Sequence, residues 1–429
     1  MTRQRAVVTA AAVVAAVCAM SAAPPRATAA PSPLSSVKHV WVLVLENENA
    51  EVTFANNSPA PYLSSTLPSM GAFVPQYFGI GHVSLDNYIA MISGQAPNPV
   101  TQSDCQVFAD FAPPVPVIAT NGQATGTGCV FPSGVPTLAN QLNTAGLTWR
   151  GYMEDMATPC RHPNVNAQDQ TQSAKVGDQY ATRHDPFMYF HSIIDNNASC
   201  QSHVVDLSAL NTDLASAATT PNFSFITPNL CHDGHDSPCV DKQPGGLVSA
   251  DTFLQEWVPK ILASDAYKQD GMLVITFDEA EVGNPSSATA CCGESPGPNS
   301  PSPGIDGPGG GRVGAVVLSP FTQPGTTTAT AYNHYSLLRT IEDAFGLDHL
   351  GFAAASGLQP FGTDVLNAAP AAPVTTSTTT ATATTAASGR RGAALPTTGG
   401  STPFAPPATV AVVAMAVLIV TRRRKKNFG

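Results

Sequence analysis

Residues 37–45, Val-Lys-His-Val-Trp-Val-Leu-Val-Leu, form a near-continuous apolar run that ends in Glu46-Asn47. Such a run is typical of a strand that is buried on both faces of a parallel sheet. Patterns of the same kind predict further strands at 147–153, 222–227, 272–277 and 312–318, with helices at 84–93, 137–145, 249–266 and 336–345. This alternation predicts an α/β fold with a mainly parallel central sheet and helices on both faces.

Polar side chains gather where these strands end. Glu46-Asn47 follows the first strand, Cys231-His232-Asp233-Gly234-His235-Asp236 follows the strand at 222–227, and Asp278-Glu279 follows the strand at 272–277. Open α/β sheets place their active sites at the carboxyl ends of their strands. Imidazoles and carboxylates so placed could bind a metal or transfer protons. A polar surface turn between Cys231 and Cys239, and ordinary loop carboxylates, are the alternatives.

Ser84 stands at the start of the helix predicted for 84–93, and we expect it to be the N-cap. Free backbone N–H groups and the helix dipole make this end of a helix suitable for a phosphate. A cap without a catalytic role is the other interpretation.

The two ends of the chain have the composition of targeting segments. Residues 1–30 combine Arg3 and Arg5 with an apolar run and a small-residue cleavage site, which predicts a secretory signal peptide. Leu395-Pro396-Thr397-Thr398-Gly399, an apolar stretch at 408–420 and a basic cluster at 422–426 resemble the sorting signal that sortases of Gram-positive bacteria cleave, so residues 395–429 are interpreted as that signal. A single membrane anchor is the alternative.

Between these ends, residues 371–394 are rich in Thr and Ala and predict a flexible stalk, which leaves residues 34–370 as the folded domain. We therefore expect a secreted protein that is attached to the cell wall of an actinobacterium-like host, with sortase and peptidoglycan as partners. All 30 acidic residues but only half of the 20 basic ones lie in the domain, whose net charge is therefore near −20. This charge argues against nucleic acid as a partner.

Eight cysteines remain after the signal peptide, an even number that permits up to four disulfides in an oxidising compartment. Cys291 and Cys292 are neighbours, and we expect them to bond to different partners.

Six short motifs occur in order along the domain. They are Val42-Leu43-Val44-Leu45-Glu46-Asn47, Gly81-His82-Val83-Ser84-Leu85-Asp86-Asn87-Tyr88, Arg183-His184-Asp185-Pro186-Phe187, the loop at 231–236, Thr276-Phe277-Asp278-Glu279 and Tyr332-Asn333-His334-Tyr335-Ser336. Together they resemble the bacterial phosphoesterase family of non-haemolytic phospholipases C and acid phosphatases, which is related in fold to alkaline phosphatase. The likeness is greatest to the secreted acid phosphatases, which include a mycobacterial phosphatidylinositol 3-phosphate phosphatase.

The resemblance implies a role for each matching residue. Ser84 would be the nucleophile that forms a phosphoseryl intermediate, and His232, His235 and His334 would transfer protons or complete a metal shell. Asn87, His184 and Asn47 would contact the substrate. A divalent metal, if present, would be bound by Glu46, Asn47, Asp278, Glu279 and Asp233. Val83 and Asp86 stand where relatives often carry proline, and three candidate histidines leave a one-metal or metal-independent mechanism open.

The resulting hypothesis is a secreted phosphatase that hydrolyses phosphomonoesters, either small molecules or phospholipid headgroups. A phospholipase C-type phosphodiesterase is the alternative within the enzyme class. A surface-displayed binding module without catalysis is the alternative outside it.

Overall fold

The computed structural model describes residues 33–293, 297, 303–304 and 307–368. The described residues belong to one compact unit. The predicted signal peptide, stalk and sorting signal lie outside them. Within the described part of the chain, no helix combines the length and the apolar character that crossing a bilayer requires.

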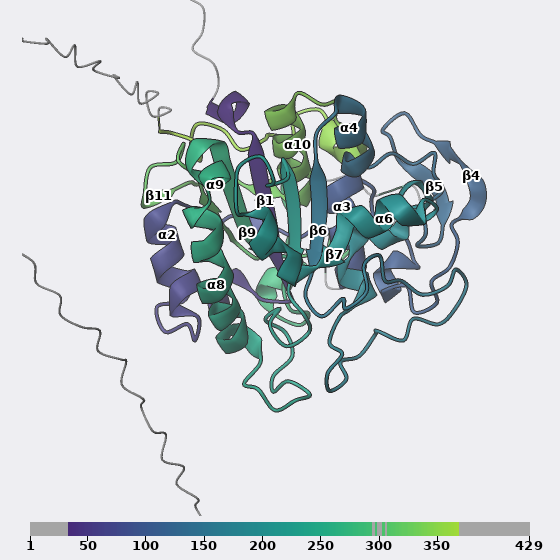
Figure 1. The fold of residues 1–429 in the computed structure, drawn as a ribbon, viewed down its shortest axis with the longest axis horizontal. Helices are drawn as coiled ribbons and strands as arrows, with labels where there is room; N and C mark the ends of the chain where they lie inside the picture. Colours follow the sequence, from purple (N-terminus) through teal and green to yellow (C-terminus); the bar gives the residue numbers. More distant parts are fainter. Residues whose placement is uncertain (1–32, 294–296, 298–302, 305–306, 369–429) are drawn as a thin grey trace, which may run out of the picture. The chain divides into compact units, whose positions relative to one another are not determined.

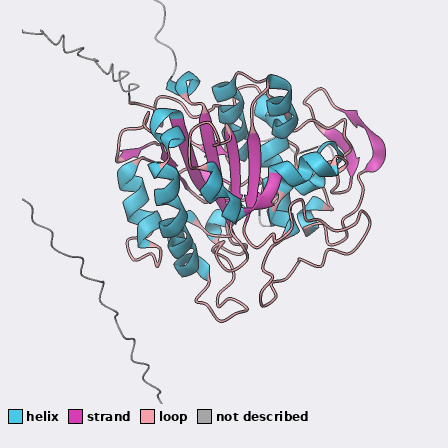
Figure 2. Cartoon of the chain, in the orientation of Figure 1, coloured by secondary structure: helices cyan, strands magenta, loops and turns pink. Residues whose placement is uncertain are grey.

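An eight-stranded sheet forms the centre of the domain (Figures 1 and 2). Its strands, in spatial order, are β11 (Thr326–Thr327), β2 (Ala72–Val74), β10 (Ala315–Leu318), β9 (Gly271–Phe277), β1 (His39–Leu45), β8 (Phe223–Thr227), β6 (Trp149–Met153) and β7 (Val204–Asp206). The five strands from β9 to β7 run parallel, whereas β10 is antiparallel to β9 and β2. The mainly parallel sheet expected from the sequence is confirmed.

Strand β1 lies at the centre of the parallel region, where Val42 pairs with Phe225 of β8 and Val274 of β9. Every residue of β1, β8 and β9 is buried. Because successive side chains of a strand point to opposite faces, both faces of the sheet must be covered. Burial of β1 on both faces of the sheet therefore explains the apolar run at 37–45, as inferred from the sequence.

The longer helices agree closely with the predicted ranges. They are α3 (Ser84–Ser93), α4 (Leu138–Ala145), α8 (Gly246–Ala263), α9 (Asp265–Asp270) and α10 (His334–Phe345). The helix predicted at 249–266 is divided at Ser264, whose backbone is extended and whose hydroxyl accepts a hydrogen bond from Tyr267 N, so that it caps α9. Thr137 and Asn140 form a capping box at the start of α4.

Short elements complete the described fold. They are α1 (Ala50–Thr53), α2 (Leu67–Met70), α5 (His191–Ile194), α6 (Asn197–His203) and α7 (Leu210–Asp213), the pair β3 (Tyr77–Phe78) and β12 (Tyr332–Asn333), and the ribbon β4 (Ala112–Ile118) and β5 (Ala124–Thr127). The β4–β5 ribbon lies apart from the central sheet, at the edge of the molecule in Figure 2.

Four disulfides form, joining Cys105 to Cys129, Cys160 to Cys200, Cys231 to Cys239 and Cys291 to Cys292. The expectation that Cys291 and Cys292 bond to different partners is therefore wrong. The other six cysteines of the described residues pair among themselves, which leaves Cys291 and Cys292 to bond to each other.

The fold buries one carboxyl far from the strand ends. Glu342 of α10 is fully buried; its Oε1 accepts a hydrogen bond from Leu350 N at 2.9 Å, and its Oε2 has no partner among the described residues. Burial raises the pKa of Glu342 from 4.5 to about 9, with a smaller contribution from Asp343. The folded state thus keeps a proton that the unfolded chain releases.

We predict that the free energy of unfolding falls as pH rises from about 4.5 towards 9, because the unfolded state then binds fewer protons at this group. Glu342→Gln keeps the acceptor for Leu350 N and should raise the free energy of unfolding at pH 8 by at least about 1 kcal/mol, measured by urea denaturation. Glu256→Gln, at an exposed carboxylate, is the matched control. Equal pH slopes in wild type and Glu342→Gln would contradict this explanation.

Candidate active site

Three acidic residues from different strand ends meet at the carboxyl edge of the sheet. Glu46 follows β1, Asp278 follows β9, and Asp233 lies in the loop after β8. Glu46 N donates a hydrogen bond to Asp233 O at 2.8 Å, and Asn47 N donates to the Asp278 carboxylate at 3.0 Å. Asn47 also donates through its side chain to Glu46 Oε2 at 3.1 Å. The convergence expected from the sequence is present.

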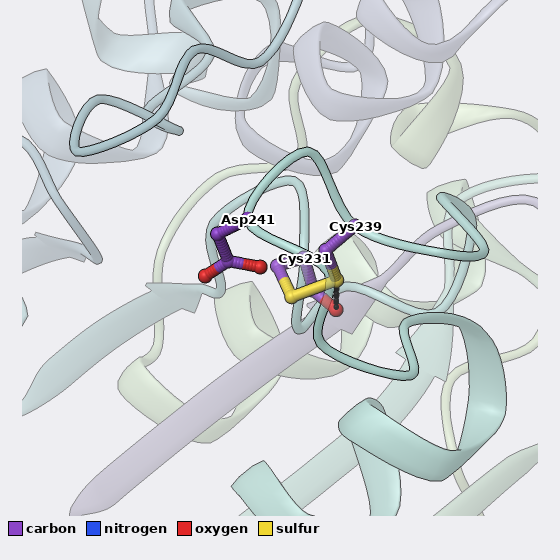
Figure 3. A group of neighbouring side chains, drawn as sticks. All are labelled: Cys231, Cys239 and Asp241. Atoms are coloured by element: carbon purple, nitrogen blue, oxygen red, sulfur yellow. Dashed lines mark hydrogen bonds between the residues drawn. A yellow bond between two sulfur atoms is a disulfide. The ribbon is translucent and has the colours of Figure 1, made fainter. Parts of the chain in front are cut away.

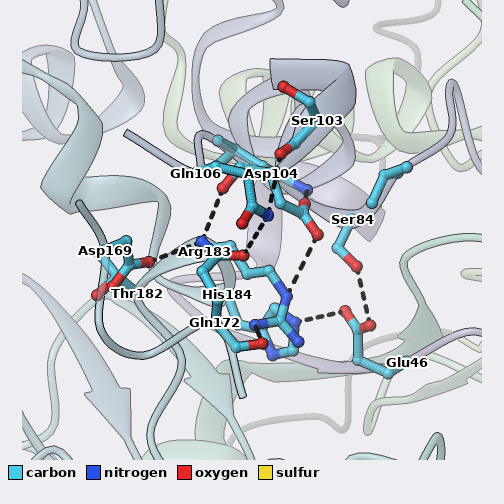
Figure 4. Close-up of polar contacts among 12 residues, drawn as sticks. Glu46, Ser84, Ser103, Asp104, Gln106, Asp169, Gln172, Thr182, Arg183 and His184 are labelled. Carbon is cyan, nitrogen blue, oxygen red and sulfur yellow. Dashed lines mark hydrogen bonds and ion pairs between the residues drawn. The ribbon is translucent and has the colours of Figure 1, made fainter. Parts of the chain in front are cut away.

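Ser84 is the first residue of α3, and its hydroxyl faces these carboxylates. Ser84 Oγ donates a hydrogen bond to Glu46 Oε2 at 2.9 Å (Figure 4), and only 2% of Ser84 is exposed. The expected N-cap role is wrong, because Val83 occupies the N-cap position and the serine hydroxyl points to Glu46 instead of back to its own helix. Asp104 supplies the missing acceptor by taking a hydrogen bond from Leu85 N at 3.0 Å.

Asn87 holds the loop that leads into α3. Its Oδ1 accepts hydrogen bonds from Ile80 N and Gly81 N, and its Nδ2 donates to Gly81 O at 3.1 Å. With both ends of the amide bonded to backbone, Asn87 stabilises the approach to Ser84 in this structure. Its contact with a phosphoryl oxygen remains a prediction from the resemblance.

His184 lies between two of the acidic residues. Its Nε2 is 3.2 Å from Glu46 Oε1, and its Nδ1 is 3.9 Å from Asp233 Oδ2. The ring stacks on Tyr88 of α3, with 5.2 Å between ring centroids. One ligand atom from each of Glu46, His184 and Asp233 lies within 4.8 Å of the others. The structure therefore brings His184, expected to contact substrate, into a group that could hold a metal ion.

Several buried oxygen and nitrogen atoms of this group lack hydrogen-bond partners among the described residues, and a bound cation would provide them with a partner. Oε1 of Glu46, Oδ2 of Asp233, Oδ2 of Asp278 and both nitrogens of His184 are buried and form no hydrogen bond with any residue that the structure describes. Buried polar atoms are nearly always bonded, so such a set calls for a ligand. Two or three carboxylate oxygens and one imidazole nitrogen suit a divalent transition metal.

Burial dominates the electrostatics of the site. It raises the pKa of Asp278 to about 6 and that of Asp233 to about 7. The pKa of Glu46 rises well above its usual value through burial and the nearby charges of Asp278 and Asp233. Burial lowers the pKa of His184 well below its usual value, with Arg183 and His235 adding to the effect. A neutral imidazole is the form that binds a metal.

Arg183 places a cation beside this acidic group. It is 9% exposed; its Nε is 3.4 Å from Asp104 Oδ2 and its guanidinium donates to Gln172 O at 3.3 Å (Figure 4). The sequence interpretation quoted Arg183 in a motif without giving it a role and did not name Asp104. A lone arginine before His184, in a domain poor in basic residues, is the signal that could have identified it.

The histidines of the 231–236 loop face different neighbours. His235 N donates to Asp233 Oδ1 at 3.0 Å, and about half of its side chain is exposed. His235 lies close enough to Asp278 and His184 to influence the pKa of both groups. His232 contacts Glu154 of the β6 end instead, with Nδ1 2.9 Å from Glu154 Oε1, and this bond raises the pKa of His232. Glu154 had no role in the sequence interpretation.

His334 and Glu279 point to other partners. His334 is fully buried; its Nδ1 is 3.1 Å from the Tyr77 hydroxyl and its Nε2 is 2.5 Å from Asp278 O. It therefore supports the backbone that carries Asp278 and has both nitrogens engaged. Glu279 forms a buried pair with His82. Their expected roles in proton transfer and metal binding stay predictions.

A second group of possible ligands, Cys231, Cys239 and Asp241, is shown in Figure 3. Both sulfurs are used in the disulfide that closes the loop, so no thiolate is available to a metal. The disulfide instead holds the ends of the segment that contains His232, Asp233 and His235. The sequence left the pairing of these cysteines open, and the structure pairs Cys231 with Cys239.

Comparisons with known proteins place the chain among phosphatases in sequence similarity. The chain is 26% identical over 336 residues to a phosphate-repressible acid phosphatase of Penicillium chrysogenum, which covers 76% of this chain and 65% of that protein. It is 25% identical to a phosphatidylinositol-3-phosphatase of Mycobacterium tuberculosis, over 77% of this chain and 84% of the relative. A solved alkaline phosphatase superfamily structure from Vibrio parahaemolyticus aligns with a TM-score of 0.44 at 12% identity, over 77% of this chain and 72% of that one.

The fungal relatives are longer than the matching region, since the chain spans less than two thirds of the Penicillium chrysogenum protein and 60% of a probable acid phosphatase of Kluyveromyces lactis. The model of the phosphoesterase family matches residues 40–348, which include β1, α3, the 231–236 loop and α10. This chain belongs to the phosphoesterase family.

Proposed function

We propose that this protein hydrolyses phosphomonoesters and that Ser84 is the nucleophile. The observation that carries the proposal is the hydrogen bond from Ser84 Oγ to Glu46 Oε2, at a site where buried acidic residues and one buried arginine meet. A serine hydroxyl needs an adjacent acceptor to become a nucleophile, and Glu46 is that acceptor. The names of the acid phosphatase relatives support a monoester as the substrate class.

The reaction has two steps. Ser84 Oγ attacks phosphorus, its proton passes to Glu46 Oε2, and the ester oxygen leaves with a proton from a partly exposed histidine of the 231–236 loop. Water then attacks the phosphoseryl intermediate and gives a proton to a loop histidine, the Oγ–phosphorus bond breaks to release phosphate, and Glu46 returns the proton to Ser84 Oγ. His232 and His235 are the partly exposed histidines of the loop, and they suit proton exchange with the leaving group and with water.

Glu46, His184 and Asp233 would hold a divalent cation, with Asp278 beside them. Such a cation supplies charge that offsets the carboxylates and polarises a phosphoryl oxygen. Without a positive charge, three carboxylates would repel a phosphate dianion. Arg183 adds to the positive side of this balance, and we infer that its guanidinium attracts the doubly charged phosphoryl group of a monoester.

We also infer that the protein acts outside the cell and is attached to the cell wall through its carboxyl-terminal sorting signal, with sortase and peptidoglycan as partners. The four disulfides support an oxidising compartment. The predicted signal peptide supports secretion, and the predicted sorting signal supports attachment to the cell wall. A free phosphate ester and a phospholipid headgroup both present the chemistry that the site recognises.

We predict that Ser84→Ala lowers kcat/KM for 4-nitrophenyl phosphate by at least ~10³-fold, because no intermediate can form. Ser93→Ala at the end of the same helix, where the hydroxyl donates only to Ile89 O, is the matched control and should stay near wild type. Mass spectrometry of acid-quenched wild type should show phosphate on Ser84. Full activity in Ser84→Ala would exclude the proposed nucleophile and favour a different mechanism.

We predict that chelation removes a divalent metal from the purified protein and lowers phosphatase activity, and that adding a divalent metal restores it. Asp233→Asn should reduce the metal content measured by elemental analysis, because it removes one charged ligand. Asp241→Asn is the control, since Asp241 belongs to the group whose sulfurs are in a disulfide. A protein that retains its activity with no bound metal would contradict the metal site.

We predict that Arg183→Gln lowers kcat/KM for a phosphomonoester by at least ~10²-fold and lowers it less for the matching diester, which carries one negative charge fewer. Arg161→Gln, which removes an arginine paired with Asp178 away from Ser84, is the control. Circular dichroism would verify that both variants fold. Wild-type preference for the diester would promote phospholipase C-type hydrolysis, and no turnover of either ester would promote a binding module.

A further inference from the structure

Glu154 and His232 form a pair beside the proposed phosphoryl site. His232 Nδ1 is 2.9 Å from Glu154 Oε1 and 3.0 Å from Oε2. We propose that Glu154 is a positioning residue that holds the His232 ring so that Nε2 gives a proton to the leaving-group oxygen. This inference rests on the proposed phosphatase function and concerns which group serves the alcohol side of the substrate.

The pair is fixed from several directions. Glu154 Oε2 also accepts a hydrogen bond from Asn229 N at 2.9 Å. Asn229 Oδ1 in turn accepts from Cys231 N and His232 N at 3.0 and 3.1 Å. One carboxylate thus binds both the ring and the backbone turn that carries it. The disulfide from Cys231 closes the same turn.

The bond to Glu154 decides which nitrogen of the ring faces outward. Both Glu154 oxygens already lie at Nδ1, and an ionised carboxylate only accepts hydrogen bonds, so Nδ1 carries a proton. Nε2 has no hydrogen-bond partner within the described part of the chain, and 35% of the His232 side chain is exposed. A ring fixed through Nδ1 presents Nε2 for proton exchange, as in other His–carboxylate pairs.

The position of the pair fits the alcohol side of the site. Glu154 follows β6, and β8 separates β6 from β1, the strand that ends at Glu46. His232 immediately precedes Asp233, whose carboxylate lies 3.9 Å from His184. His232 is thus next to Asp233 in the chain, and its ring contacts Glu154 on the β6 side of the acidic group. In the first step Nε2–H protonates the departing alkoxide, and the partly exposed ring regains its proton from solvent. The proton of the water that attacks in the second step passes to His235, the other partly exposed histidine of the loop.

This role depends on the leaving group. An alkoxide leaves poorly unless it is protonated, whereas 4-nitrophenolate leaves without a proton. Loss of an oriented acid should therefore slow alkyl phosphates far more than 4-nitrophenyl phosphate. A structural defect would slow both substrates alike.

The test uses the full chain with glycerol phosphate and 4-nitrophenyl phosphate. Glu154→Gln and His232→Gln should each lower kcat for glycerol phosphate by ~10²-fold, with little change in KM, and lower kcat for 4-nitrophenyl phosphate by less than about threefold. The double variant should be no slower than His232→Gln, because Glu154 acts through His232. Asp155→Asn is the matched control, since Asp155 bonds to Asn229 Nδ2 at 2.8 Å and not to His232.

Parallel losses for both esters in Glu154→Gln, or additive losses in the double variant, would overturn the positioning role. Nitrogen-15 NMR of the wild-type histidine rings, with His232 identified from the His232→Gln spectrum, provides a second measurement that does not need a folded Glu154 variant. It should show a proton on Nδ1, and an unprotonated Nδ1 would also overturn the role. Ser84→Ala in the same assays separates this outcome from failure of the proposed function, because it should stop both esters.

Discussion

The close approach of Glu46, Asp233 and Asp278 is the constraint on which the rest of the site depends. Three parallel strands end side by side and bring these carboxyl groups out of water together. Burial raises the pKa of each, so the group is unfavourable as three bare anions. A bound cation would lower this cost. The buried carboxylates thus favour the binding of a positive charge at the place where the proposed chemistry requires a cation.

The residues around the acidic group offset its negative charge and hold its members in position. Arg183 places positive charge at the edge of the acidic group, and stacking on Tyr88 orients His184 between Glu46 and Asp233. Asp104 links two parts of the arrangement, because it binds both Arg183 and the first turn of α3. The Glu46 carboxylate therefore accepts the Ser84 hydrogen bond through Oε2 and leaves Oε1 for the proposed cation.

Much of the fold was predictable because its signals are local. The apolar runs of β1 and β9 and the helical spacing of α3 are patterns among neighbouring residues. The ends of both strands were therefore predicted correctly. The antiparallel direction of β10 and the pairing of Cys291 with Cys292 were not predictable, because both depend on which distant segments lie nearby. Arg183 and Glu154 were missed for the same reason, since each gains its role only from a partner far along the chain.

Local sequence patterns were sufficient to predict the α/β architecture, the edge of the sheet where the polar groups gather, and the candidate residues Ser84, Glu46 and Asp278. Periodicity and strand-end chemistry are sufficient for that because they act over a few residues. The partners of these side chains became known from the fold, which pairs Ser84 with Glu46, His184 with Glu46 and Asp233, His232 with Glu154, and His334 with Tyr77. Hydrogen bonds act over about 3 Å, and folding alone brings such residues that close.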